Sequence, residues 1–139
     1  MASVAQLPNG DLITGKTSSL LGASSALLLN CLKALANIPR NEKLIPPEVI
    51  GPIQDLKLNY LGNSNPRLHT DEVLVALSIT AATSEKATLA LSQLPQLKGC
   101  EVHTSVILSE VDENIFRRLG VNLTCDPVYQ SRRLYHKGR

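Results

Sequence analysis

The first residues that could do chemistry lie near the start of the chain, where their spacing matches a phosphate-binding loop. The pattern G-x-x-x-x-G-K-[ST] binds phosphates through backbone amides and a lysine, and it is matched here by Gly10, Gly15, Lys16 and Thr17. Between the two glycines stand Asp-Leu-Ile-Thr, which favour a strand, and the preceding Pro-Asn-Gly favours a tight turn. We therefore predict a hairpin over residues 3–15. A nucleotide- or phosphate-binding domain that uses Gly10 to Thr17 stays open as an alternative.

A second polar group precedes an apolar run at residues 73–79. It consists of Arg67, His69, Thr70, Asp71 and Glu72. Because a helix N-terminus exposes unpaired amides, a helix that begins here could bind an anion with help from the arginine. The alternative is structural: Thr70 or His69 caps the helix, the two acids face the positive end of the helix dipole, and Arg67 pairs with them.

A third group alternates along a predicted strand. Glu101, His103 and Ser105 share one face, and a carboxylate, an imidazole and a hydroxyl are the components of a nucleophilic triad. Neighbours on one strand face stand about 6.6 Å apart and project in parallel, so they do not hydrogen-bond to one another. No G-x-S-x-G motif accompanies them. We therefore interpret this set as a polar strand face, or as an interface with a further domain.

The sequence contains no pattern typical of a metal or redox centre. The three histidines lack metal-ligand spacing, so we predict no metal site. The cysteines are odd in number and form no C-x-x-C pair: Cys31, Cys100 and Cys125. Such a set suits a reducing compartment, and we expect a cytoplasmic protein. The sequence leaves open which cofactor is bound, if any, and whether the protein is an enzyme.

Composition limits the classes of partner. The chain has 139 residues, which suit one domain over residues 1–139. Three Tyr, one Phe and no Trp leave little for stacking on bases, so we predict no specific nucleic-acid binding. The net charge of +2 arises from a basic tail, residues 126–139, that carries Arg132, Arg133, Lys137 and Arg139. No apolar run is long enough for a membrane span, and none follows a charged start as in a secretion signal. We therefore predict no membrane partner.

Capping and stop signals predict several helices after the hairpin. A helix capped by Thr17 or Ser18 is expected to end at the Ile-Pro pair at 38 and 39, with small residues at its start for close packing. The next is expected to start at the Pro-Pro pair at 46 and 47, to kink or restart at Pro52, and to stop at Gly62. A third begins near residue 70, and a fourth is capped by Ser84.

The C-terminal third predicts a strand-helix-strand unit. Apolar and polar residues alternate over Glu101 to Leu108, Ser109 caps a short helix, and Val121 to Cys125 forms a second strand. A connection of this kind makes the two strands parallel. The sequence therefore predicts an α+β fold. It is a helix-rich single domain whose small mixed sheet combines the N-terminal hairpin with the C-terminal strand-helix-strand unit.

Four long phrases resemble one bacterial family. They are TGKTSSLLGASSALLLNCLKALANI, NPRLHTDEVLVALSITAAT, LPQLKGCEVHTSVILSEVDENIFRRLG and TCDPVYQSRRLYHK. From about Leu7 to Lys137 the chain resembles the C-terminal part of the proteins of domain-of-unknown-function family 1846, an uncharacterised protein family. The resemblance implies a longer protein with a large N-terminal partner domain, which carries its own glycine-rich, phosphate-loop-like segment. It implies no reaction and no catalytic residue.

Three classes of function follow. The first is an accessory domain of a larger cytoplasmic bacterial protein, which contributes to an inter-domain ligand site. The candidate ligand-binding residues are Lys16, Thr17, Arg67, His69, Thr70, His103 and Ser105. The second is a structural or oligomerisation module without a ligand, which could form a homo-oligomer. The third is the phosphate-binding domain described above. We expect the chain to fold alone and to catalyse no reaction alone.

Overall fold

The sheet begins with the hairpin that the Pro-Asn-Gly turn predicts. The computed structural model describes residues 1–129, and in it β1 (Ala2–Gln6) pairs antiparallel with β2 (Leu12–Lys16). Gly10 adopts a φ of 91°, a conformation that glycine reaches without strain. The predicted hairpin is confirmed. The segment from Gly10 to Thr17 is therefore largely a paired strand, and it does not form a flexible loop between a strand and a helix.

Two further strands complete a mixed sheet. β3 (Glu101–Thr104) pairs antiparallel with β1, and β4 (Asn122–Cys125) pairs parallel with β3, in the order β2-β1-β3-β4. The predicted α+β class and the mixed sheet are confirmed. The strand predicted to reach Leu108 is too long, because the Thr104 hydroxyl donates to the Val106 carbonyl at 2.7 Å. This local bond competes with regular strand pairing after Thr104, although Ile107 still forms an isolated parallel bridge with Tyr129.

The first helix starts later than its sequence predicts. α1 spans Ala23–Leu35 with Gly22 at its N-cap, so the prediction of a cap at Thr17 or Ser18 is wrong. Ser18 Oγ instead accepts hydrogen bonds from the N–H groups of two leucines that follow it, at 3.2 and 3.1 Å. The second of these, Leu21, forms a parallel bridge with Leu68. This long-range pairing keeps residues 18–22 out of the helix.

The remaining helices begin at their predicted caps. α2 (Pro47–Asp55) runs through Pro52 without a restart and leads into a π-helical segment, η1 (Leu56–Tyr60). Beyond η1, Gly62 has a φ of 72°. The other helices are α3 (Thr70–Ala81), α4 (Glu85–Leu91), a 3₁₀ turn η2 (Leu94–Leu97) and α5 (Glu110–Arg118). Ser84 and Ser109 accept hydrogen bonds from the first turns of α4 and α5, as predicted.

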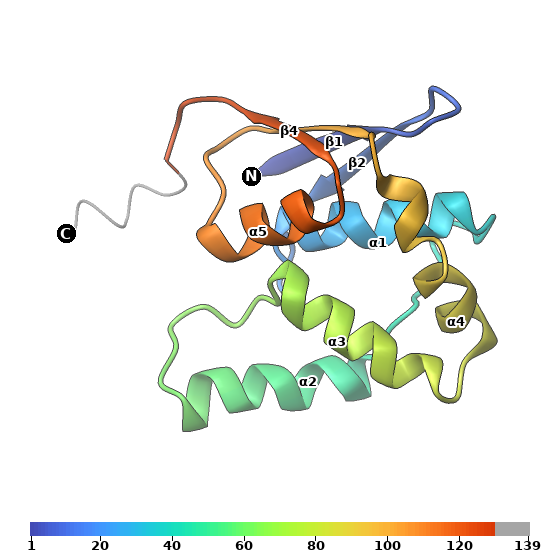
Figure 1. The fold of residues 1–139 in the computed structure, drawn as a ribbon. Helices are drawn as coiled ribbons and strands as arrows, with labels where there is room; N and C mark the ends of the chain where they lie inside the picture. Colours follow the sequence, from blue (N-terminus) through green and yellow to red (C-terminus); the bar gives the residue numbers. More distant parts are fainter. Residues whose placement is uncertain (130–139) are drawn as a thin grey trace.

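The helices cover one side of the sheet. Figure 1 shows α1 and α5 beneath the sheet, with α3 and α2 in a further layer below. A Cβ atom added at Gly15 would lie 2.4 Å from Leu27 N and 2.6 Å from Ala23 O, so β2 and α1 meet backbone to backbone. This contact explains the small residues at the start of α1. We call the opposite side, on which no helix of residues 1–129 packs, the outer sheet face.

Candidate functional site

The structure divides the seven candidate residues between two places. The outer sheet face and its margin hold Lys16, Thr17, His103 and Ser105, and the start of α3 holds Arg67, His69 and Thr70. Of the first group, Lys16, His103 and Ser105 line a concavity, and Thr17 lies beside it. The second group is hydrogen-bonded within the protein. The two places therefore have different chemistry.

The outer sheet face carries a shallow concavity of about 450 Å³. Strand alternation places Lys16 of β2, Val4 of β1 and His103 of β3 on this side, because residues two apart along a strand share a face. Ser105, Asp126 and Thr14 also belong to its polar lining. Among the residues that the structure describes, no side chain or carbonyl binds the Lys16 ammonium. That charge is available to a ligand.

His103 is held by two neighbours on β4 and its C-terminal extension. Its Nδ1 lies 2.7 Å from Thr124 Oγ1, and its Nε2 lies 3.1 Å from Asp126 Oδ1. A neutral imidazole with its proton on Nε2 fits both contacts, since it donates to the carboxylate and accepts from the hydroxyl. The carboxylate and the hydroxyl together fix the ring orientation, and both ring nitrogens are engaged within the protein.

Among residues 1–129, the outer face contains no nucleophilic triad. Ser105 Oγ accepts the N–H of Ala2 at 3.1 Å, and Glu101 accepts the side-chain amide of Asn122 at 2.7 Å. Neither of them bonds to His103. The group can therefore offer polar contacts to a ligand, but Ser105 is not activated by the imidazole.

Asp126 is a candidate that sequence reasoning missed. The parallel register pairs His103 with Thr124, and Asp126 follows two residues later on the same side. The register between two strands about twenty residues apart cannot be predicted from the sequence of either strand. The available signal was a polar Thr-x-Asp at the end of the predicted partner strand.

At the start of α3 a carboxylate of the protein occupies the position that a bound anion would take. The Thr70 N–H and hydroxyl donate to Asp112 Oδ1 of α5 at 3.0 and 2.7 Å. His69 Nδ1 lies 3.9 Å from Asp112 Oδ2, which is an ion-pair distance rather than a hydrogen bond. Asp112 therefore links α3 to α5, and these two candidates have structural partners.

Arg67 does not pair with the acids that follow it. Its Nε donates to the Ser18 carbonyl at 2.6 Å, and Lys57 Nζ instead binds Glu72 Oε1 at 2.8 Å. Lys57 also donates to the Arg67 carbonyl at 2.6 Å. The predicted pairing of Arg67 with the acids is thus wrong. Its partner comes from the segment that the Leu21–Leu68 bridge brings close, which local sequence cannot reveal.

The pKa values at the start of α3 follow from burial and pairing. Burial raises the pKa of Asp112, but His69 and the two donors of Thr70 outweigh it and hold the pKa below its ordinary value. The same carboxylate raises the pKa of His69, against the opposing effect of burial. Each partner therefore favours the charged form of the other.

Other reactive groups are sparse in the described part of the chain. Within residues 1–129, no three His, Cys, Asp or Glu side chains come together as metal ligands. All three cysteines are free thiols, and burial, with Cys100 nearby, raises the pKa of Cys31 to about 12. None of the helices of residues 1–129 has both the length and the apolar character to cross a bilayer. The basic residues of the predicted tail, from Arg132 onward, lie outside the described residues.

These features define an α+β domain whose sheet has one packed and one open face. The family model "Domain of unknown function DUF1846, C-terminal" matches residues 1–135, and the chain belongs to this family. The resemblance noted in the sequence is thereby confirmed.

Several bacterial proteins are similar to this chain along most of its length. UPF0371 proteins of Streptococcus pyogenes serotype M5 (strain Manfredo) and serotype M1 are each 56% identical to it over 132 residues. A UPF0371 protein of Corynebacterium glutamicum (strain R) is 58% identical over 132 residues. Each match covers 95% of this chain but 27% of the relative. The chain therefore spans about a quarter of the length of these relatives, whose names state no activity.

Proposed function

We propose that this chain is the C-terminal accessory domain of a longer bacterial protein, and that its outer sheet face completes a ligand site with the preceding part of that protein. The observation that carries the proposal is the concavity that gathers Lys16, His103 and Asp126 on a sheet face without a described helix. The length of the relatives supports the presence of a further domain to cover it.

The physical reason is that the outer face is half of a site. Ligand pockets enclose most of the surface of their ligand and exclude water, which strengthens the polar contacts inside them. The concavity on the sheet is open to solvent, so it encloses a ligand only when a second surface closes over it. Lys16 then supplies a charge, and the oriented pair of His103 and Asp126 supplies polar contacts.

Docking is tested by expressing this chain and the rest of the longer protein separately. Isothermal titration calorimetry should detect their association. Val4→Lys places a charge in the centre of the outer face and should weaken association at least about tenfold, since an unpaired buried charge disrupts an interface. Val75→Lys is the matched control on the exposed side of α3 and should bind as the wild type does. The opposite pattern would exclude the outer face as the docking surface.

The ligand is tested on the longer protein itself. It is purified, denatured and analysed by mass spectrometry for small molecules that it retained, in the wild type and in Lys16→Gln and His103→Gln. We expect a retained compound that both substitutions deplete. If the two parts associate through the outer face but no such compound is found, the domain is a structural module and the proposal of a ligand site is overturned.

A structural or oligomerisation module is the second candidate, and one observation favours it. Val75 and Ile79, one turn apart on α3, are 59% and 60% exposed. Exposed apolar pairs of this kind occur at interfaces between subunits. If this candidate is right, size-exclusion chromatography with light scattering should show a homo-oligomer that Ile79→Asp dissociates. The accessory-domain proposal expects the same molar mass for the wild type and the variant.

The phosphate-binding alternative needs the amides of residues 11–14 to face a ligand. The hairpin instead pairs β2 with β1 over its whole length. We therefore expect a titration with magnesium and ATP to give no submillimolar binding. Submillimolar binding that Lys16→Ala abolishes would favour the alternative.

A further inference from the structure

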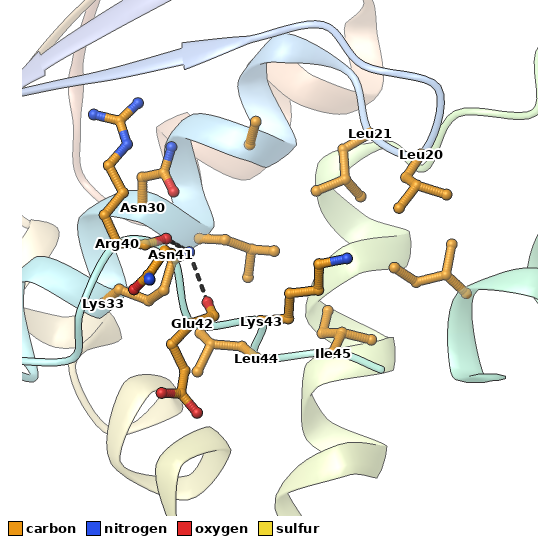
Figure 2. Close-up of a pocket in the computed structure, with 13 residues that line it drawn as sticks. Leu20, Leu21, Asn30, Lys33, Arg40, Asn41, Glu42, Lys43, Leu44 and Ile45 are labelled. Carbon is orange, nitrogen blue, oxygen red and sulfur yellow. Dashed lines mark hydrogen bonds between the residues drawn. The ribbon is translucent and has the colours of Figure 1, made fainter. Parts of the chain in front are cut away.

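A second pocket lies away from the outer sheet face, between α1, the loop at residues 40–45 and α2. Its volume is about 290 Å³, and Ala26 and Leu29 of α1 and Ile50 of α2 form part of its wall. Figure 2 shows the residues that line it. None of them belongs to the candidate groups that the sequence singles out.

The lining of this pocket is divided into a polar and an apolar end. Asn30, Lys33 and Arg40 lie together at one end, on the left in Figure 2. Leu20, Leu21 and Ile45 lie at the other end, with the Lys43 side chain pointing from the loop toward the two leucines. A ligand that matches both ends must itself be amphipathic.

The pocket is positively charged within a part of the protein that is not. Three cations line it: Lys33, Arg40 and Lys43. The acidic residue in the same lining, Glu42, already pairs with Lys86 at 2.8 Å. Residues 1–129 as a whole carry ten basic and twelve acidic side chains. The excess of positive charge is therefore local, and it favours an anion.

Lys33 is the most enclosed of these cations, at 9% exposure. Its ammonium donates to the carbonyls of Arg40 and Glu42 at 2.7 and 3.0 Å, so it holds the loop that forms the pocket wall. Burial and the nearby Arg40 lower the pKa of Lys33, while Glu42 opposes them. An ammonium has three donors, and the described residues supply two acceptors, both uncharged carbonyls. A buried cation whose hydrogen-bond acceptors are both uncharged is stabilised further by an anion beside it.

Lys43 offers a second cation at the mouth of the pocket. It is exposed, and none of the described residues forms an ion pair or hydrogen bond with its ammonium. Arg40, in contrast, already donates to the Thr14 carbonyl and hydroxyl at 3.2 and 3.1 Å. A ligand would therefore gain its new ionic contact from Lys33, and the exposed charge of Lys43 would add longer-range attraction.

We propose that this pocket binds a small amphipathic carboxylate, with its acid group at the polar end beside Lys33 and its apolar tail against the leucines at 20 and 21. At roughly 30 Å³ per non-hydrogen atom, the volume suits a ligand of about ten such atoms. The site is separate from the outer sheet face, so it stands or falls independently of the proposed function.

The probe is sodium octanoate, with 1-octanol as its uncharged counterpart. Both are titrated into the protein and followed by amide chemical shifts. We expect saturable shifts at Asn30, Asn41 and Lys43 with octanoate, and binding at least about fivefold weaker for the alcohol, which lacks the ionic contact. Equal binding of the two, or no saturation by octanoate at millimolar concentration, would overturn the proposal.

Two substitutions and one control locate the site. Ala26→Leu fills the pocket from α1 and should weaken octanoate binding about tenfold or more, since two lost methylene contacts are worth that factor. Lys43→Gln should weaken it about threefold to fivefold, as expected for an exposed charge. Arg118→Gln removes an exposed charge on α5 and should leave binding unchanged. Urea unfolding checks that each variant is folded, and unchanged affinity in folded Ala26→Leu would contradict the proposal.

Discussion

The protein uses the same three residue types in two very different settings. The buried cluster is His69, Thr70 and Asp112, and the open cluster is His103, Thr124 and Asp126. The Asp112 side chain is 13% exposed and that of Asp126 is 55% exposed. Water competes for Asp126 far more than for Asp112, although the His69 side chain is still 35% exposed. The difference shows that burial, and not residue type, separates a structural link from a group available to a ligand.

The largest expected effect tests the packing of α1 against the inner face of the sheet, opposite the open cluster. Gly15→Ala would drive a Cβ atom into the backbone of α1, which cannot move as a flexible side chain can. We expect it to lower the free energy of unfolding by about 3 kcal/mol. Urea unfolding measures the change.

Gly51→Ala in α2 is the matched control for this experiment, because a Cβ there meets no atom within 4 Å. It should stabilise the protein by roughly 0.5–1 kcal/mol through helix propensity. If Gly15→Ala were as well tolerated, the close contact of β2 with α1 would be refuted.

The next effect compares the two clusters directly. Asp112→Ala leaves the Thr70 N–H and hydroxyl without an acceptor and removes the partner of His69, so it should cost about 2–3 kcal/mol. Asp126→Ala removes an exposed partner and should cost no more than about 0.5 kcal/mol. Both are measured by urea unfolding at neutral pH. Equal losses would mean that the clusters do not differ as their burial indicates.

The buried cluster should also make stability depend on pH. The folded pKa of His69 is raised, so its contribution is complete below the ordinary histidine pKa of about 6.5 and is lost as pH rises through the folded value. The folded pKa of Asp112 is lowered, so its contribution is present above the ordinary aspartate pKa and is lost as pH falls through the folded value. The pair therefore stabilises the fold most in the mildly acidic range between these limits.

The measurement is urea unfolding of the wild type and of His69→Gln between about pH 6 and pH 9. The free energy of unfolding of the wild type should exceed that of His69→Gln by a margin that shrinks as pH rises. This decrease should be smaller than the loss of unfolding free energy in Asp112→Ala, because only one charge is neutralised. Asp112→Asn should reduce the same dependence, since it removes the carboxylate that raises the pKa of His69. A wild-type advantage that grows with pH would contradict the predicted sign.

The smallest effect compares the exposed and the buried parts of the protein through the reactivity of their thiols, and it leaves stability unchanged. Cys125 on β4 is exposed, whereas Cys31 and Cys100 are buried. A disulfide reagent such as DTNB should modify one thiol per folded chain rapidly and the other two only in urea. Cys125→Ser should remove the rapid phase. Rapid reaction of a second thiol would show that the packed layer opens readily.

Local signals were sufficient for much of the fold. Pro-Asn-Gly predicted the hairpin, and Ser84 and Ser109 predicted the starts of α4 and α5, because turn and capping preferences act over a few residues. The alternation of Glu101 to Thr104 predicted a strand with one buried side. Where a local capping signal conflicted with a long-range contact, the long-range contact determined the structure. Residues 18–22 pair with Leu68 and stay out of α1.

The sequence by itself thus determined the element types, the α+β class and the family of this protein, along with which strand residues share a face. Only the tertiary structure decided that Asp112 joins His69 and that Asp126 joins His103. These partners lie more than twenty residues apart, on elements whose mutual register depends on the packing of the whole core. Propensity and periodicity act within one element, whereas the pairing of charges between elements is set by which surfaces bury the most apolar area.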